Sequence, residues 1–517
     1  MMEFITLVIP FLLYSTIFER NFWKWISIIL FTCFLLAIIL FMTRSTWVAV
    51  FAGSLIVLIG ITLIKKYRIK RLKWLIIGIT AIIIGSFFML RNNNFNPEAS
   101  ALTKQLGKIT KFNHGTVKDR LVLWEKTIDL SAEKPLMGHG LGSWKFEILR
   151  KGNAGLQSED NLTFYQRPHN DYLWILAETG IIGLIIYLTI IAMVFTTALK
   201  ILRRLNQPDH QFFLISMLFS LVSYLTISLF SFPLDRIAHP LMLFTIIAGI
   251  LIFEKATYQT KRRFVSKPIL SAIILLSMLV ILMVFQRIDG EVHLKKAFIH
   301  RSQQNWDKVI QETSKINNLY YPIDPFSTPV DWYTGLAYFQ QKDLKTAYQY
   351  FQKAHNLNPY HIYVLNDLAT SSALLEKPDR AIKFYKQAIS YAPNFNEAIY
   401  NLSTILFHTG KKDSAFHYFA QIRPDNVSDR HIKLLEAIVY PRMHQIASEI
   451  NENEIKKAIH NMIGVHKWTS KIVHKSYQND SLTFKQQLIL DAIFILEKNN
   501  TFAATKSKTL KSKYNLP

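Results

Sequence analysis

Arginine and histidine side chains gather in two short segments that border apolar runs. The segment "QRPHNDYLW" holds Arg167, His169, Asn170 and Asp171, and "SFPLDRIAHPL" holds Arg236. Guanidinium groups bind phosphate oxygens through paired hydrogen bonds, and a neutral histidine can accept a proton near physiological pH. These residue types together predict a site for an anionic phosphate group, with a base beside it.

Two further arginines are candidates for the same chemistry. Arg44, in "MTRSTW", is the only charged residue between Lys24 and Lys65, and it lies at the junction of two apolar runs. A charge at membrane depth is a functional candidate, although an arginine that reaches to lipid headgroups is the alternative interpretation. Arg120 lies on a helix expected over residues 117–131.

Metal binding is a competing interpretation of the histidines in this part of the chain. No tight spacing of histidine and carboxylate supports it, and the single cysteine, Cys33, excludes a cysteine-rich metal site. We therefore expect neither a metal nor another cofactor. The "GHGLGSW" segment is weak evidence for phosphate binding and is expected to be a plain turn. The histidines in question are His114, His139, His169 and His239.

Long uncharged apolar runs occur repeatedly within residues 1–290 and are nearly absent from the rest of the 517-residue chain. A helix needs about 20 apolar residues to cross the hydrocarbon core of a bilayer. This pattern excludes a purely soluble enzyme and predicts a polytopic helical bundle of about eight spans. The expected spans are 2–18, 24–43, 46–64, 74–90, 172–199, 211–232, 238–253 and 268–285.

The net charge of +24 is explained by topology, so nucleic acid is not an expected partner. Lysine and arginine concentrate in the loops that follow the first, third, fifth and seventh spans, and such loops face the cytoplasm. The large loop 91–171 and everything after residue 286 then lie outside the cytoplasm. An enzyme acting there needs a pre-activated substrate, usually one linked to a lipid.

The C-terminal part repeats with a period of 34 residues. Alanine recurs at 347, 381 and 415, and an aromatic residue recurs at 351, 385 and 419. This spacing is typical of tetratricopeptide repeats, which build an α-helical solenoid and commonly bind peptides or protein partners. We expect the repeats over 291–427, most clearly at 328–423, followed by a helical tail over 428–517. The alternative is a solenoid that only packs on the membrane domain.

The chain resembles the O-antigen ligase and O-antigen polymerase superfamily of bacterial membrane glycosyltransferases. The segments that carry the resemblance are "TRSTW", "DRLVLWEKTIDLSAEKPLMGHGLGSW" and "RPHNDYLWILAETGIIGLIIYL", within roughly 30–200. Some members also carry tetratricopeptide repeats. Members usually have more spans than the eight expected here, and the difference falls before "TRSTW". The chain is either a short variant or lacks its first helices, and only in the second case do we expect an incomplete lipid groove and a loss of activity.

The resemblance implies that a glycan is moved from an undecaprenyl-pyrophosphate carrier to an acceptor hydroxyl, with inversion and without a metal or nucleotide. It implies that Arg44 and Arg120 hold the donor pyrophosphate and that His169 is the base. Arg167 is expected to contact phosphate or sugar. The residues expected to support the site are Asn170, Asp171 and Arg236.

Several functions remain open at this stage. The acceptor could be the lipid A core of lipopolysaccharide, a growing glycan or a protein hydroxyl, the last of which defines a protein O-oligosaccharyltransferase. Two non-enzymatic alternatives are a membrane-anchored scaffold that works only through its repeats, and a transporter of a polar lipid. In each case we expect a protein of the bacterial cell envelope in the inner membrane, with its repeats on the extracytoplasmic side.

Overall fold

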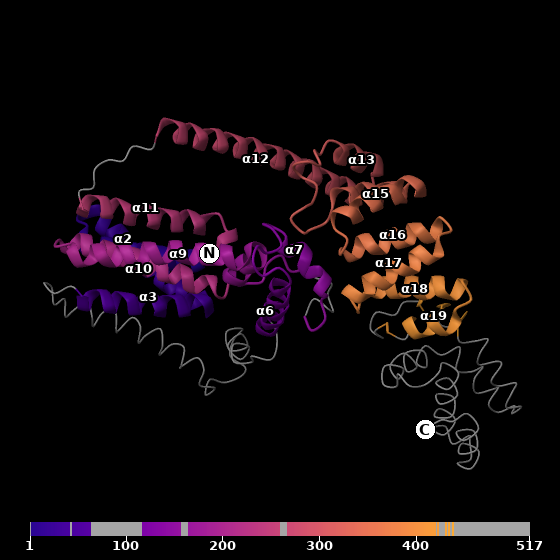
Figure 1. Ribbon diagram of the computed structural model, residues 1–517, viewed down its shortest axis with the longest axis horizontal. Coiled ribbons are helices and arrows are strands. Elements are labelled where there is room, and N and C mark those ends of the chain that lie inside the picture. The colour runs from indigo at the N-terminus through magenta and orange to yellow at the C-terminus, as the bar shows by residue number, and fades with distance from the viewer. Residues whose placement is uncertain are drawn as a thin grey trace, which may run out of the picture. The chain divides into compact units, whose positions relative to one another are not determined.

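The computed structural model describes residues 2–41, 44–63, 116–156, 164–258, 266–419 and a few positions between 421 and 438. Within this part the chain forms sixteen α-helices and no β-strand, which confirms the all-α prediction. The chain divides into two compact units (Figure 1). The membrane unit is Met1–Ile148 with Tyr165–Leu270, and the solenoid unit is Leu149–Phe164 with Ser271–Pro517.

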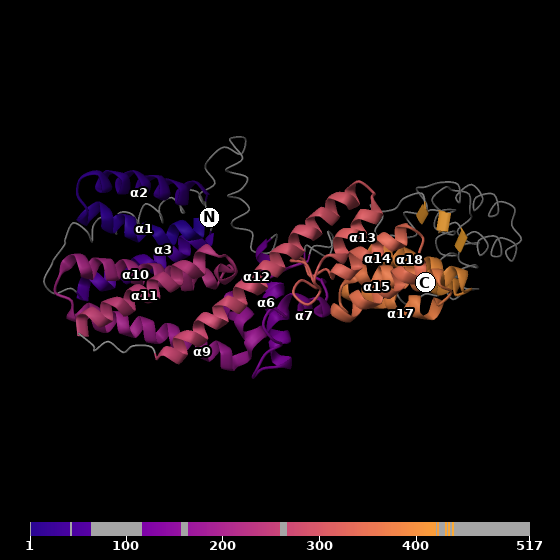
Figure 2. The same cartoon turned by 90° about the horizontal axis from the view of Figure 1, so that it is seen from above.

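Apolar helices make up most of the membrane unit, and they run alongside one another in both views (Figures 1 and 2). Five described helices of the chain are long and apolar enough to cross a bilayer, and two shorter helices are also apolar. The span expected over 74–90 lies outside the described residues. The helices of this unit are α1 (Met2–Phe18), α2 (Asn21–Phe41), α3 (Arg44–Leu63), α6 (Thr116–Glu133), α7 (Trp144–Glu147), α9 (Asp171–Arg204), α10 (Pro208–Ser228) and α11 (Ala238–Tyr258).

Helix α10 is the central helix of the membrane unit. About three quarters of its apolar window is buried, against less than a fifth for α9 and for α11. Hydroxyl groups on α10 join it to its neighbours: Ser220 Oγ donates to the Leu7 carbonyl at 2.7 Å, and Ser223 Oγ donates to the Ala49 carbonyl at 3.1 Å. Small polar residues of this kind allow helix backbones to approach closely in a membrane.

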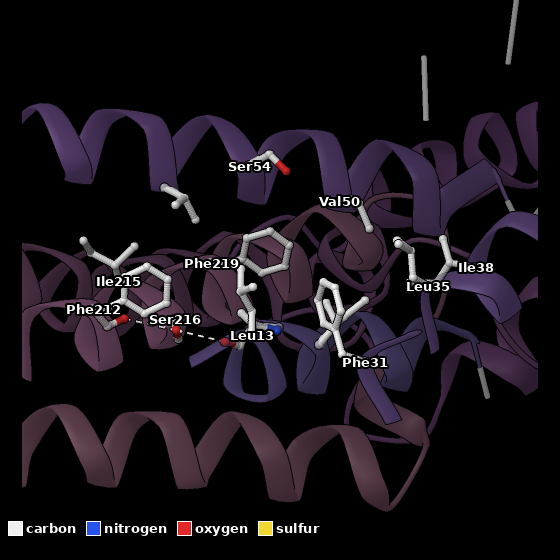
Figure 3. A pocket seen from close by; sticks show the side chains of 13 residues that line it. Leu13, Phe31, Leu35, Ile38, Val50, Ser54, Phe212, Ile215, Ser216 and Phe219 are labelled. Atoms are coloured by element: carbon white, nitrogen blue, oxygen red, sulfur yellow. Dashed lines mark hydrogen bonds between the residues drawn. The ribbon is translucent and has the colours of Figure 1, made fainter. Parts of the chain in front are cut away.

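A pocket with a mostly apolar lining opens between α1, α2, α3 and α10 (Figure 3). Its polar member Ser216 is already satisfied, because its Oγ lies 3.1 Å from the Pro10 carbonyl and 3.0 Å from the Phe212 carbonyl. The remaining lining therefore offers mainly hydrocarbon contacts. It consists of Ile9, Pro10, Leu13, Phe31, Leu35, Ile38, Val50, Ser54, Val57, Phe212, Ile215 and Phe219.

Helix α9 is broken at Gly180, which has φ 67° and ψ −172°. The turn after α6 packs against this break. The His139 and Gly140 amides donate to the carbonyls of Ala177 and Glu178, both at 2.9 Å. A Cβ at Gly180 would lie 2.2 Å from the Leu136 carbonyl oxygen, so only glycine fits there.

Most of α12 (Lys267–Ser302) belongs to the solenoid unit, and its first half is apolar and exposed. Paired helices follow it, and α15 to α19 stack one after another in Figure 1. The alanines at 347, 381 and 415 are fully buried, as are the aromatic rings at 351, 385 and 419. The period of 34 residues is thereby confirmed as the core of the repeats. The helices are α13 (Trp306–Ser314), α14 (Val330–Gln340), α15 (Leu344–Leu357), α16 (Ile362–Leu374), α17 (Pro378–Tyr391), α18 (Asn396–His408) and α19 (Lys412–Phe419).

Candidate functional site

The segment that holds Arg167 and His169 leads directly into α9. Asn170 is the N-cap of this helix, and its Oδ1 accepts hydrogen bonds from the backbone amides of Tyr172 at 3.0 Å and Leu173 at 3.1 Å. His169 has φ 58°, a left-handed conformation that side-chain-bearing residues adopt infrequently. The cap thus fixes the backbone immediately after His169.

Helix α6 supports the same segment from the other side. Trp124 Nε1 donates to the Pro168 carbonyl at 2.9 Å, and Tyr165 Oη donates to Asp119 Oδ2 at 2.7 Å. Burial and the hydrogen bond to Asp119 both raise the pKa of Tyr165, so the phenol remains a donor. Two side chains of α6 and the cap of α9 therefore position His169.

The ring of Phe232 brings the cationic side chains together. Phe232 lies in the loop between α10 and α11. The guanidinium carbon of Arg167 is 5.1 Å from its centroid and that of Arg236 is 4.7 Å away, while the His169 ring meets it edge-on at 5.0 Å. Cations are attracted to the face of an aromatic ring. Arg167, His169 and Arg236, which the sequence predicts as site residues, are thus gathered at one ring.

Both of these arginines form ion pairs. Arg167 is paired with Asp235, and Arg236 Nη1 lies 2.5 Å from Glu3 Oε2. Each ion pair is partly exposed, so the guanidinium groups are accessible from solvent. An incoming phosphate would have to compete with, or share, these carboxylate partners.

Glu3 ties the start of α1 to this site. Its Oε1 accepts from Ser45 Oγ at 2.9 Å, and its Oε2 accepts from Ser231 Oγ at 3.1 Å in addition to the pair with Arg236. Ser45 follows Arg44, the first residue of α3. The backbone of Arg44 is therefore held near the site, whereas its side chain lies outside the described residues.

Asp171 helps to hold the backbone of the site in place. Its side chain is fully buried, and its Oδ2 accepts from the backbone amide of Leu234 at 3.1 Å. This bond joins the start of α9 to the loop between α10 and α11. Asn170 and Asp171 thus both order the backbone around His169.

The electrostatic setting of His169 favours its neutral form. Burial, followed by the positive charges of Arg120, Arg167 and Arg236, lowers its pKa from 6.5 to about 4, while Glu3 opposes this shift. Arg120, on α6, is thus one of the positive charges that act on the imidazole. At neutral pH the ring can therefore accept a proton.

The glycine-rich turn has a structural role in this unit. The carboxylate of Glu178 accepts from the backbone amides of Gly142 at 2.8 Å and Trp144 at 3.1 Å, so these amides are already used. His139 Nε2 lies 2.9 Å from the Leu130 carbonyl oxygen. Among the described residues no three histidine, cysteine or acidic side chains are placed to hold a metal ion, and His114 lies outside that part.

Two central residues of the site were missed by the sequence reasoning. Glu3 is an acidic residue inside an apolar run, and that pattern could have marked it as a candidate. Phe232 carries no comparable signal, because one phenylalanine among 36 in the chain shows nothing of what packs on it.

Two separate regions of the chain match models of known protein families. Residues 28–188 match the family model described as O-antigen ligase. The resemblance of the membrane part to the O-antigen ligase family is thereby confirmed. The match includes Arg44, Arg120, Arg167 and His169, while Arg236 lies beyond it.

Residues 293–473 match a second model, described as the protein kinase G tetratricopeptide repeat. A solved tetratricopeptide repeat protein from Parabacteroides merdae is similar at 13% identity and a TM-score of 0.27, over 44% of this chain and 92% of that one. No curated protein matches the chain. At the level of family, the O-antigen ligase match together with the apolar helices supports a membrane glycosyltransferase of this type.

Proposed function

We propose that this chain transfers a glycan from an undecaprenyl-pyrophosphate carrier to an acceptor hydroxyl at the extracytoplasmic face of the bacterial inner membrane. The observation that carries the proposal is the neutral His169 placed among Arg120, Arg167 and Arg236. This set provides a proton acceptor beside groups that bind phosphate, and His169, Arg120 and Arg167 lie within the region that matches the O-antigen ligase family.

In the proposed reaction, the diphosphate leaves as the acceptor oxygen attacks the anomeric carbon. Guanidinium groups stabilise the negative charge that develops on the leaving group, and we assign this role to Arg44 and Arg120, with Arg167 beside them. His169 takes the proton of the attacking hydroxyl. Attack on the face opposite the diphosphate inverts the anomeric centre, and no step requires a metal.

The ends of the helices support one common site. The starts of α1, α3, α9 and α11 and the end of α10 meet through the bonds of Glu3 and Asp171. The charge pattern of the loops supports an extracytoplasmic position for these ends, where lipid-linked glycans are available and nucleotide sugars are absent.

The test is glycan transfer in cells that lack their own copy of the protein. We expect His169→Ala and Arg120→Ala to abolish transfer while the proteins still insert in the membrane at wild-type amounts. Lys118→Ala, an exposed cation on the same helix, is the matched control and should retain transfer. Full transfer by both site variants would refute the assignment.

The glycan that accumulates in the deletion strain identifies the acceptor. Unligated lipid-linked polymer indicates a ligase, single repeat units indicate a polymerase, and unglycosylated protein indicates a protein O-oligosaccharyltransferase. The tetratricopeptide repeats favour a large acceptor or a protein partner. A scaffold without catalysis would instead keep its phenotype in the His169 variant and lose it when residues 291–517 are deleted.

A further inference from the structure

Part of the large loop belongs to the solenoid unit rather than to the membrane unit. The segment Leu149–Phe164 clusters with the repeats, and the membrane unit resumes at Tyr165. Residues 149–156 and Phe164 are described, and those between them are not. Both described ends of this segment contact the repeats.

The first contact is made by the backbone near Asn153. The backbone amide of Asn153 donates to the Tyr391 carbonyl at 3.0 Å. Gly152 has φ 70°, and a Cβ at this position would lie 3.2 Å from the same carbonyl oxygen. Leu156, in the turn that follows, is buried. This part of the loop thus packs closely on the end of α17.

The second contact is aromatic. The ring of Phe164 stacks on His361 with centroids 5.3 Å apart and planes inclined by 28°, and it meets Tyr363 edge-on at 6.0 Å. Burial lowers the pKa of His361 to about 4, so at neutral pH its ring is uncharged and suited to stacking. Phe164 also packs against the core cluster of α16 to α19.

The two contacts follow one edge of the solenoid. His361 is the N-cap residue of α16, and the residue one repeat later, Phe395, is the N-cap of α18. Tyr391 ends α17 shortly before Phe395. The two described contacts therefore lie on the edge at which one repeat ends and the next begins.

We propose that this edge of the solenoid is a docking surface for residues 152–156 and Phe164 of the same chain. Phe164 is then a positioning residue, because it anchors the backbone shortly before Arg167 and His169. The effect of Phe164 on catalysis rests on the proposed function, whereas the docking itself does not. It also implies that the solenoid lies on the same side of the membrane as the large loop, independently of the charge pattern.

Disulfide formation tests the docking without reference to activity. In a Cys33→Ser background, Asn153→Cys should form a disulfide with Tyr391→Cys, because their backbones are hydrogen-bonded. Leu357→Cys is the matched control, since Leu357 occupies the equivalent exposed position one repeat earlier. Formation with Tyr391→Cys alone supports the proposal. Equal formation with both partners, or with neither, overturns it.

Kinetics test the positioning role. Removing the stack by Phe164→Ala or by His361→Ser, which replaces the capping ring nitrogen by a hydroxyl oxygen, should lower kcat roughly ten- to hundredfold while the KM of the lipid donor changes little. Phe164→Tyr and His361→Phe keep the stacked rings and should retain kcat. The double variant Phe164→Ala with His361→Ser should be no worse than either single change.

Unchanged kcat in both ring-removing variants overturns the positioning role. If the wild-type protein transfers no glycan, the proposed function fails, whereas the disulfide experiment still decides whether the loop docks on the solenoid. The two failures are therefore distinguishable.

Discussion

Glu3 and Arg236 form an ion pair of 2.5 Å across 233 positions of the chain. The pair joins the start of α1 to the loop that also carries Phe232 and Asp235. Because Arg236 stacks on Phe232, and Phe232 contacts both Arg167 and His169, Glu3 influences the whole site without a catalytic role of its own.

Glu3→Gln should weaken this connection. The change leaves an acceptor for Ser45 and Ser231 but removes the charge opposite Arg236. We expect a loss of about 1 to 2 kcal/mol of stability, less than for a fully buried pair because 35% of the Arg236 side chain is exposed. The lower melting temperature can be measured on purified protein in detergent.

The exposed Glu19, just after α1, provides the control for that experiment. Glu19→Gln removes the same charge without touching the site and should leave the melting temperature unchanged. In a double-mutant cycle, Arg236→Gln should cost little more once Glu3 is already glutamine. Additive losses would show that the two side chains do not interact.

The N-cap of α9 can be separated from a substrate-binding role by two substitutions. Asn170→Ala removes the acceptor for the Tyr172 and Leu173 amides and should cost about 1 kcal/mol, together with reduced transfer. Asn170→Ser restores a capping oxygen on a shorter side chain and should recover both. Stability is followed by thermal melting and transfer by the cell-surface glycan. Recovery of stability without activity would instead place the Asn170 amide on the substrate.

Gly180 and Gly142 provide a matched pair of glycines with positive φ. Alanine at Gly180 meets the Leu136 carbonyl at 2.2 Å, in a backbone region that is nearly restricted to glycine. Gly180→Ala should therefore prevent the turn from packing on α9 and greatly reduce the amount of folded protein. A Cβ at Gly142 meets no atom within 4 Å, so Gly142→Ala should cost only about 1 kcal/mol of stability, from backbone strain at its positive φ. Similar folded yields of the two variants would contradict this account.

The sequence was sufficient for features that repeat or that depend on composition. The alanines and aromatic residues at a spacing of 34 became the solenoid core because burial follows the helical period. Seven of the eight expected spans correspond to apolar helices among the described residues, because the bilayer demands long uncharged runs.

Tertiary contacts between distant segments were beyond the sequence. No local pattern shows that Glu3 pairs with Arg236, or that the loop residue Phe164 stacks on His361 in the repeats. Such contacts depend on how the helices pack, and periodicity does not specify this. The sequence named Arg167, His169 and Arg236 as candidates, and the structure brings them to one ring, while Phe232 and the carboxylate of Glu3 emerged only from the structure.

The protonation of His169 predicts an unusual dependence of activity on pH. Because its pKa is lowered to about 4, the neutral ring persists well below the ordinary histidine pKa of 6.5. The acid limb of kcat/KM reports ionisation in the free enzyme. We expect kcat/KM for purified protein in lipid vesicles to stay level as the pH falls from 7 through 6.5, and to decline only as it approaches the lowered pKa.

Arg120→Gln should move this acid limb to higher pH. After burial, the positive charge of Arg120 is the largest cause of the lowered pKa, so its removal makes protonation of His169 easier. Lys118→Gln removes a charge of the same sign from an exposed position on the same helix, and should leave the limb in place. The test compares the pH of the acid limb and not the maximum rate. Arg120 is also expected to bind the donor, so its loss lowers the rate at every pH. An acid limb near 6.5 in all three proteins would mean that His169 is not the group whose neutral form is required.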